Sequence, residues 1–289
     1  FRALDARGEL GGAVAVKRVP VARLSAQGRA ALQREVDLLA FLRGHPKVVQ
    51  YVGHGEDKAG HLWLVTEYCE GGSVQDLLDL TPDGLREEQI AHVCREALEA
   101  LAGLHAKGLL HRDVKCGNML VTSAGHVKLG DFGAAQRAAD ATPGDWTAGP
   151  LWAAPEVLAN RPYGPPSDVW SVGIGAIQMV QHLPPHHDVH PLRARSLIVE
   201  GGPPTLSRPQ DQSGAFLAFL ARCLAKAPEE RATAAELLAG SAFLRPENQL
   251  TGACLAEPLA RRCEYLREVA AEGLQEQREA AVPAPPGGG

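Results

Sequence analysis

Short β-rich runs separated by turns dominate the first quarter of the chain. Residues 1–4, 13–19, 48–52 and 62–66 are rich in apolar and β-branched side chains, a composition that predicts strands. Within 30–42 the apolar positions instead recur at helical spacing, at Leu32, Val36, Leu39 and Leu42. The pattern therefore predicts a small antiparallel sheet accompanied by one helix.

Helical periodicity dominates the remainder of the chain. Residues 85–105 carry an apolar stripe, and the segment that begins at Ser167 is apolar on nearly every face, which indicates a buried helix. Residues 257–281 are rich in Ala, Glu, Leu and Arg, and they predict a helix that packs on the preceding lobe or trails into solvent. Residues 282–289 have the composition of a linker.

Composition and charge exclude several classes of protein. A length of 289 residues suits two lobes or one large domain, and 45% hydrophobic with 22% charged residues is ordinary for a globular chain. The net charge of −5 offers no basic surface for nucleic acid or an anionic membrane, and the longest apolar run, 172–177, is far shorter than a membrane span. Six scattered cysteines without a Cys-x-x-Cys pair indicate free thiols in a reducing compartment, so we expect a cytoplasmic protein.

Two short motifs carry the candidate chemistry. Residues 111–118 read His-Arg-Asp-Val-Lys-Cys-Gly-Asn, and 131–133 read Asp-Phe-Gly. Asp113 and Asn118, with Lys115 between them, place a candidate base, a metal ligand and a phosphate contact on one loop. The Asp of the second motif adds another hard oxygen ligand of the kind that Mg²⁺ prefers. Together they form the set that phosphoryl transfer from a nucleotide to a hydroxyl requires, whereas a lone His-Arg-Asp would indicate a surface turn.

The two motifs resemble those of eukaryotic serine/threonine protein kinases. The resemblance implies an α+β, bilobal fold, with a small antiparallel β-sheet and one helix in the N-lobe, residues 1–69, and a mostly helical C-lobe, residues 70–244. Residues 245–281 would form a C-terminal helical extension, followed by a disordered linker at 282–289. ATP and Mg²⁺ are the implied cofactors, and the Lys two residues after the catalytic Asp favours serine or threonine over tyrosine as the acceptor.

The catalytic and metal-binding roles follow from the same resemblance. Asp113 is expected to orient the substrate hydroxyl and to accept its proton, while Lys115 neutralises the transferring phosphoryl group. Asn118 and Asp131 are expected to hold Mg²⁺, since both offer hard oxygen ligands.

Residues 15–17, Ala-Val-Lys, resemble the kinase strand whose lysine binds the nucleotide α- and β-phosphates. An exposed strand lysine would look the same, but Glu35 borders the apolar stripe of the first helix, eighteen residues after Lys17, where the two side chains can pair. Ala15 and Leu120 complete the expected nucleotide-binding set.

Residues 67–72, Glu-Tyr-Cys-Glu-Gly-Gly, resemble the kinase hinge between the lobes, although an interdomain linker followed by a helix cap would read the same. Backbone groups of Glu67 and Cys69 are expected to hydrogen-bond the adenine edge. Thr66 takes the gatekeeper position, where a small side chain leaves a back pocket open.

Three further positions are expected to hold the C-lobe together. Glu156 of the Ala-Pro-Glu motif should form a buried ion pair with Arg231. Asp168 should hydrogen-bond the backbone of the catalytic loop, because a buried unpaired carboxylate is costly.

Two departures from the kinase pattern bear on activity. Gly149 stands where related kinases carry a threonine that bridges the catalytic Asp and Lys, and Asp145 stands where they are phosphorylated. Asp145 either pairs permanently with Arg112 or, like Thr147, is a solvated loop residue. The alternative to an active enzyme is therefore a pseudokinase that acts as a nucleotide-binding or scaffolding module.

The front of the chain departs from the kinase pattern as well. The Gly-x-Gly-x-x-Gly loop that covers the phosphates in kinases is absent before residue 13. Gly8, Gly11 and Gly12 are expected to form a hairpin turn instead. We therefore expect a kinase domain that is truncated at its N-terminus, or that lacks its first strand, and that binds ATP weakly.

Two further segments indicate the branch of the kinase family. Residues 188–194, Asp-Val-His-Pro-Leu-Arg-Ala, resemble the germinal-centre branch of the sterile-twenty-like kinases, whereas 134–137 lean towards the MAP kinase kinase kinases. The first branch is favoured, and it implies a place in a kinase signalling cascade. The expected partners are a protein substrate and upstream or downstream cascade kinases, with no nucleic acid and no membrane.

Overall fold

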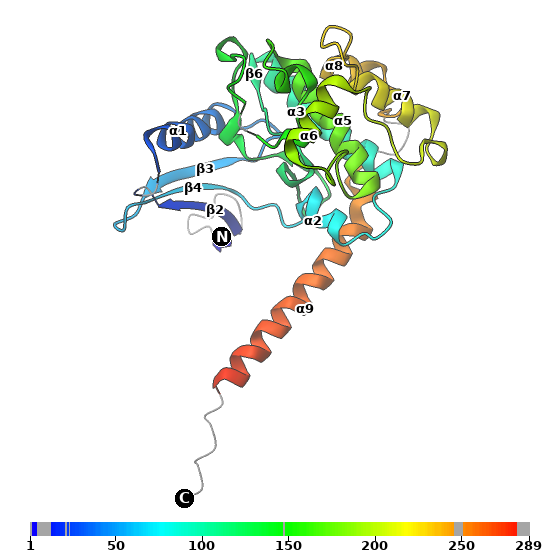
Figure 1. Cartoon of the computed structure of the whole chain (residues 1–289). Helices are drawn as coiled ribbons and strands as arrows, with labels where there is room; N and C mark the ends of the chain where they lie inside the picture. The colour runs from blue at the N-terminus through cyan, green and yellow to red at the C-terminus, as the bar shows by residue number, and fades with distance from the viewer. Residues whose placement is uncertain are drawn as a thin grey trace, which may run out of the picture.

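The computed structural model describes residues 2–4, 13–20, 22, 24–146, 148–245 and 251–281. It has two lobes of different character, a small one built on an antiparallel sheet and a larger helical one (Figure 1). The α+β, bilobal architecture expected from the sequence is therefore confirmed. The turn expected at Gly8, Gly11 and Gly12, together with Thr147 and the linker at 282–289, lies outside the described residues.

The sheet of the small lobe has the strand order β1-β2-β4-β3, and each neighbouring pair is antiparallel. The strands are β1 (Arg2–Leu4), β2 (Ala13–Pro20), β3 (Tyr51–Glu56) and β4 (His61–Glu67). The predicted start of the strand at residue 48 was wrong, because β3 begins at Tyr51. Val49 instead donates its N–H to Leu129 O, 3.0 Å away, and this bond ties the two lobes together ahead of the strand.

The helix of the small lobe is α1 (Ala26–Phe41), which begins ahead of the predicted 30–42 segment. Ser25 caps it, because its side-chain oxygen accepts a hydrogen bond from Gly28 N at 3.1 Å and so satisfies one free N–H of the first turn. Leu39 of α1 packs in a buried cluster with Leu64 of β4. The apolar stripe therefore faces the sheet, as its spacing predicted.

The large lobe consists mainly of helices. These are α2 (Val74–Asp79), α3 (Glu87–Ala106), α4 (Pro155–Leu158), α5 (Pro165–Gln181), α6 (Pro191–Glu200), α7 (Gly214–Cys223) and α8 (Ala234–Gly240). Short strands accompany them: β5 (Gly72–Ser73), β7 (Met119–Val121) and β8 (Val127–Leu129) form one sheet, and β6 (Leu109–Leu110) pairs with β9 (Gln136–Arg137). The predicted start of α3 at residue 85 was wrong by two residues. Leu85 N donates to Met179 O, and the Gln89 side chain accepts the N–H of Arg86 at 2.8 Å, so the helix begins after Arg86.

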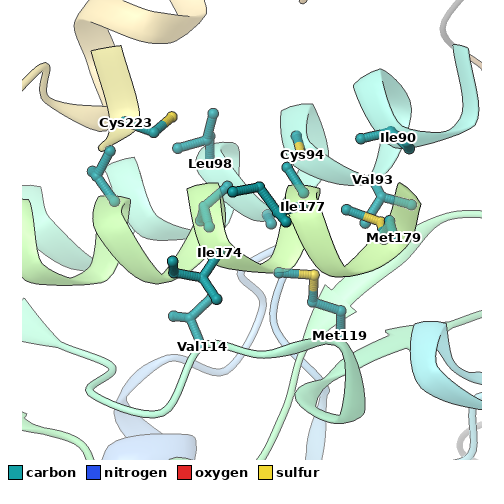
Figure 2. Packing of buried hydrophobic residues seen from close by; sticks show 14 of the residues in the cluster. Ile90, Val93, Cys94, Leu98, Val114, Met119, Ile174, Ile177, Met179 and Cys223 are labelled. Carbon is teal, nitrogen blue, oxygen red and sulfur yellow. The ribbon is translucent and has the colours of Figure 1, made fainter. Parts of the chain in front are cut away.

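α3 and α5 pack against each other at the centre of the large lobe, and Figure 2 shows their apolar side chains between them. In α5 every residue from Ser167 to Met179 is buried, which confirms the prediction of a helix that is apolar on nearly every face. Val114, within the first motif, and Met119, directly after it, lie against α5 in the same cluster. The core therefore forms a rigid support beneath loop 111–118.

The C-terminal extension begins on the large lobe and then leaves it. A 3₁₀ turn, Gly252–Leu255, leads into α9 (Ala256–Ala281). Leu255 is fully buried and Leu259 packs on the core of the lobe. Farther along α9 three apolar side chains are exposed where the helix projects into solvent (Figure 1): Tyr265, Leu266 and Val269. The start of α9 therefore packs on the large lobe, and its later part trails into solvent, so each of the two expected alternatives describes one part of the helix.

The state of the cysteines and the character of the helices bear on two expectations from the sequence. All six cysteines are free thiols, as their spacing predicted. Within the described ranges, no helix combines the length and the apolar character that crossing a membrane requires.

Glu156 of α4 and Arg231 form the buried ion pair that was expected. Arg231 donates Nη1 to Glu156 Oε1 at 2.7 Å and Nη2 to Oε2 at 3.0 Å, and neither side chain is more than 4% exposed. Arg231 also donates Nε to Ala225 O, and its guanidinium carbon lies 5.0 Å from the centre of the Trp170 ring. One arginine thereby joins α4, α5 and the segment that precedes α8.

Arg231→Ala should lower the free energy of unfolding by about 3–5 kcal/mol, because Glu156 would remain buried without a cation. Urea denaturation followed by circular dichroism measures this loss. Arg208→Ala, which removes an exposed arginine, is the control and should change stability by less than about 0.5 kcal/mol. Equal losses in the two variants would contradict the structural role of the pair.

Candidate active site

A cavity of about 450 Å³ lies between the small-lobe sheet and the loop regions of the large lobe. Its volume falls within the range of about 300–1,000 Å³ that is typical of small-ligand pockets. The residues that line it are Ala15, Val16, Lys17, Glu35, Leu39, Val49, Leu64, Thr66, Gly117, Asn118, Leu120, Gly130 and Asp131. The fold thus brings together most of the nucleotide-binding and metal-binding residues predicted from the sequence.

Lys17 of β2 and Glu35 of α1 form the expected ion pair at one end of this cavity. Lys17 Nζ lies 2.9 Å from Glu35 Oε1 and 2.8 Å from Oε2, and it also lies 3.5 Å from Asp131 Oδ1. Burial by itself would lower the pKa of Lys17, but the hydrogen bonds and charges of Glu35 and Asp131 outweigh burial and raise it. The ammonium group therefore stays charged and links α1 to the second motif.

The second motif places two neighbouring side chains in opposite environments. Asp131 has φ 57° and ψ 78°, a left-handed conformation that is uncommon for a residue other than glycine. Its carboxylate is half exposed and lines the cavity. Phe132 is fully buried, and its ring centre lies 4.9 Å from that of His111 in an edge-on arrangement. The buried ring anchors the motif while the carboxylate stays available to a ligand.

The first motif gathers its three polar side chains into one cluster. Lys115 Nζ lies 2.6 Å from Asp113 Oδ2, and Asn118 Nδ2 donates to the same oxygen at 2.8 Å and to Asp113 O at 2.7 Å. Because Nδ2 is engaged, Oδ1 is the atom with which Asn118 can coordinate a cation. Both of these side-chain donors contact Oδ2 of Asp113 and neither contacts Oδ1.

Asp168 of α5 fixes the backbone of this loop, as expected. It is completely buried, and it accepts hydrogen bonds from His111 N at 3.0 Å and from Arg112 N at 2.8 Å. His105 Nε2 lies 2.9 Å from its Oδ2. Burial by itself would raise the pKa of Asp168, but His105 and the Arg112 amide lower it, so the carboxylate stays ionised. Arg112 is thereby held at φ 68°, a strained conformation that needs such support.

Asp145 pairs with Arg112, and the alternative of a solvated loop residue is wrong. Arg112 Nη2 lies 2.6 Å from Asp145 O and 3.1 Å from Oδ1. The carboxylate also accepts hydrogen bonds from Gln136 Nε2 at 3.0 Å and from the Tyr163 hydroxyl. Burial opposes ionisation, but these donors and the charge of Arg112 lower the pKa of Asp145. A permanent carboxylate thus occupies the position expected to carry a phosphate.

Gly149 has an ordinary extended conformation. Its φ of −60° and ψ of 133° are accessible to any L-residue. A Cβ built there would lie 3.4 Å from the ring of Trp152, which is ordinary van der Waals contact. The backbone geometry at this position therefore does not require glycine.

The hinge residues lie beside the cavity without lining it, apart from Thr66. The carboxylate of Glu67 accepts hydrogen bonds from Lys128 Nζ at 2.7 Å and from Gln50 N at 2.6 Å. Burial raises the pKa of Cys69 to about 12, so its thiol stays protonated. The adenine contacts expected of Glu67 and Cys69 are made by backbone groups, and they stay predictions.

Sequence reasoning missed several residues that shape the site. Leu39, Val49 and Leu64 line the cavity. Their apolar character signalled burial but not contact with a ligand. Gln136 and Tyr163 hold Asp145, and nothing in the sequence signalled that contact, because it joins residues from separate segments.

The residues present fit Mg²⁺ and ATP. Asn118 and Asp131 offer amide and carboxylate oxygens in one cavity, and Lys17 offers a cation for phosphate oxygens. Among the described residues, no group of three or more His, Cys, Asp or Glu side chains is placed to hold a metal ion. A cation bound here would therefore take its other ligands from phosphate and water, a mode of binding that is usual for Mg²⁺.

Comparison with known proteins agrees with this geometry. Residues 5–243 match the model of the protein kinase domain. The chain belongs to the protein kinase domain family. It is 44% identical over 229 residues to Serine/threonine-protein kinase 1 of Arabidopsis thaliana, an alignment that covers 78% of this chain and 27% of the relative. The chain thus spans about a quarter of the length of that curated relative.

Lys17→Met should leave the kinase domain folded and lower the rate of phosphoryl transfer by at least about 100-fold. The substitution removes the preorganised cation that contacts the phosphate oxygens. A γ-phosphate transfer assay measures the activity, and a melting curve checks the fold. Lys58→Met, which changes an exposed lysine in the β3–β4 turn, is the control. Parental activity in Lys17→Met would refute the role of this lysine.

Asp131→Asn should weaken binding of Mg·ATP by at least about tenfold, because it removes a charged metal ligand. Asp113→Asn should change that affinity by less than about threefold, because Asp113 acts on the substrate hydroxyl. Isothermal titration calorimetry of the two variants makes the comparison. Similar Mg·ATP affinities would contradict this division of roles.

Proposed function

We propose that this kinase domain transfers the γ-phosphoryl group of Mg·ATP to serine or threonine hydroxyls of protein substrates. The observation that carries the proposal is the ammonium group of Lys17, which lies 2.8 Å from Glu35 and 3.5 Å from Asp131. In protein kinases this ion pair and the metal-binding Asp must both be in place before transfer occurs. Their simultaneous assembly supports an active enzyme.

Polar residues of the cavity and of loop 111–118 then have separate chemical tasks. Lys17 binds and orients the phosphates, and Asn118 and Asp131 hold Mg²⁺, which supplies charge stabilisation when bound. Asp113 accepts a hydrogen bond from the substrate hydroxyl and takes its proton as the new P–O bond forms. Lys115, 2.6 Å from Asp113, offsets the negative charge of the transferring group.

The acceptor class and the biological setting are part of the proposal. Lys115 two residues after Asp113 supports serine or threonine, and the name of the Arabidopsis relative agrees. The resemblance of 188–194 to the germinal-centre branch supports a role in a kinase cascade, with upstream or downstream kinases as partners. A cytoplasmic location is consistent with the free thiols.

A pseudokinase is the second candidate, and Gly149 is the observation that favours it. Without a hydroxyl at this position, Asp113 and Lys115 lack the bridge to the substrate-binding segment that related kinases have. The pair between Arg112 and Asp145 offsets this loss in part, because it ties the segment to the catalytic loop four residues before Gly149. We therefore favour a slow enzyme over an inactive one.

A γ-phosphate transfer assay with casein and with serine, threonine and tyrosine peptides tests the proposal on the purified chain. We expect transfer to serine or threonine that Asp113→Asn abolishes. Binding of Mg·ATP without transfer to any of these acceptors would favour the pseudokinase.

Gly149→Thr should raise kcat by about tenfold with little change in the KM for ATP, because a better-positioned base acts on the chemical step. The backbone conformation at Gly149 is open to any L-residue, and a Cβ there makes ordinary van der Waals contact with Trp152. Adding Asp145→Ala should reduce the gain, since the segment would lose its contact with Arg112. Steady-state kinetics on a threonine peptide measure both effects, and an unchanged kcat in a variant that binds Mg·ATP would support the pseudokinase.

A further inference from the structure

The first part of the C-terminal extension, residues 252–262, is built into the large lobe. It lies beyond the part of the chain that matches the kinase family model. Leu255 is nevertheless fully buried, and Gln89 of α3 donates its side-chain amide to Cys254 O at 3.0 Å. The extension is therefore fixed against the lobe at the point where α9 begins.

Two side chains of α9 fill space that only glycine leaves open. Gly71 and Gly72 belong to the hinge exit, by which we mean residues 70–73, the end of the hinge segment and the residue that caps α2. A Cβ on Gly71 would lie 2.6 Å from Leu259 Cδ2, and one on Gly72 would lie 2.4 Å from the guanidinium carbon of Arg262. Gly72 also has φ 69°, which disfavours any other residue. Side chains of α9 thus contact the backbone of the hinge exit directly.

Arg262 also reaches α2, the helix that follows the hinge exit. Its Nη1 lies 3.4 Å from Asp76 Oδ1, and its side chain is 15% exposed. The other oxygen of Asp76 accepts hydrogen bonds from Ser73 N at 2.7 Å and from Ser73 Oγ at 2.8 Å, which closes the cap of α2. Arg262 Nε is buried without a hydrogen-bond partner among the described residues. Such a group is costly, so stability alone does not account for an arginine here.

These contacts are close to the candidate nucleotide site. Gly72 N donates to Cys69 O at 3.0 Å, and Ser73 pairs with Leu120, which lines the cavity. Cys69 is the residue whose backbone is expected to bind the adenine edge. A shift of Gly72 would therefore displace both a predicted adenine contact and a wall of the cavity.

We propose that Arg262 is a positioning residue that braces the hinge exit and so sets the nucleotide affinity of the kinase domain. The guanidinium covers the Gly72 backbone and pairs with Asp76, which restricts residues 69–73 to one geometry. A preorganised hinge loses less conformational entropy when adenine binds. The nucleotide part of this inference rests on the proposed function, whereas the restriction of the hinge does not.

Arg262→Ala tests the proposal in the full chain. We expect the Kd for Mg·ATP, measured by calorimetry, to rise about fivefold, because the released hinge must be ordered on binding. Amide hydrogen exchange at 69–73, measured without nucleotide, should become faster as local opening grows easier. Arg261→Ala is the matched control: the neighbouring arginine pairs with Glu257 of its own helix, is 43% exposed, and should leave both quantities unchanged.

Arg262→Lys keeps the charge but loses the planar group over Gly72, so both quantities should lie between those of the parent and of the alanine variant. If Arg262→Ala does not fold, the Kd for Mg·ATP and the amide exchange at 69–73 are measured on Arg262→Lys instead. Unchanged Kd and unchanged exchange in a folded Arg262 variant would overturn the proposal, even with a lower melting temperature, because the contact would then be structural only. If the parent chain bound no Mg·ATP, the proposed function would fail, and exchange at 69–73 would still decide whether Arg262 restricts the hinge.

Discussion

A buried carboxylate in the core of the large lobe sets the geometry on which the rest of the site depends. Asp168 accepts hydrogen bonds from His111 N and Arg112 N within 3.0 Å, and it stays ionised because His105 and these amides offset its burial. The strained backbone at Arg112 is held by these bonds. Arg112 can then reach Asp145, while the next residue, Asp113, meets Lys115 and Asn118.

Burial separates the ion pairs that maintain the fold from those that are available for chemistry. The pair of Glu156 and Arg231 is almost fully buried and neither residue lines the cavity, so its role is to join elements of the large lobe. Lys17 is 48% exposed while its partner Glu35 is 5% exposed. A lysine whose carboxylate is buried but whose ammonium faces a cavity is oriented by the protein and still accessible to phosphate oxygens.

The kinase domain also holds two segments beside the candidate site with its own side chains. Asp145 gives Arg112 a carboxylate that is present without phosphorylation, and Gln136 and Tyr163 hold that carboxylate in place. Arg262 similarly places a side chain of the C-terminal extension on the hinge exit. In both cases a segment beside the candidate site is restrained by a contact within the chain, which favours a domain that is organised before substrate arrives.

The sequence by itself predicted the residues of the candidate site, and the tertiary structure decided how the segments support them. The first motif and Asp131 were predictable because they resemble the motifs of serine/threonine protein kinases, and the pairing of Glu35 with Lys17 was predictable because helical periodicity is a local property. The start of β3 at Tyr51 was not, since Val49 bonds to Leu129, far away in the sequence. The contacts of Asp145 with Tyr163 and of Gly72 with Arg262 join separate elements, so no local pattern records them. Periodicity and propensity specify elements, whereas the packing of the whole chain selects which side chains meet.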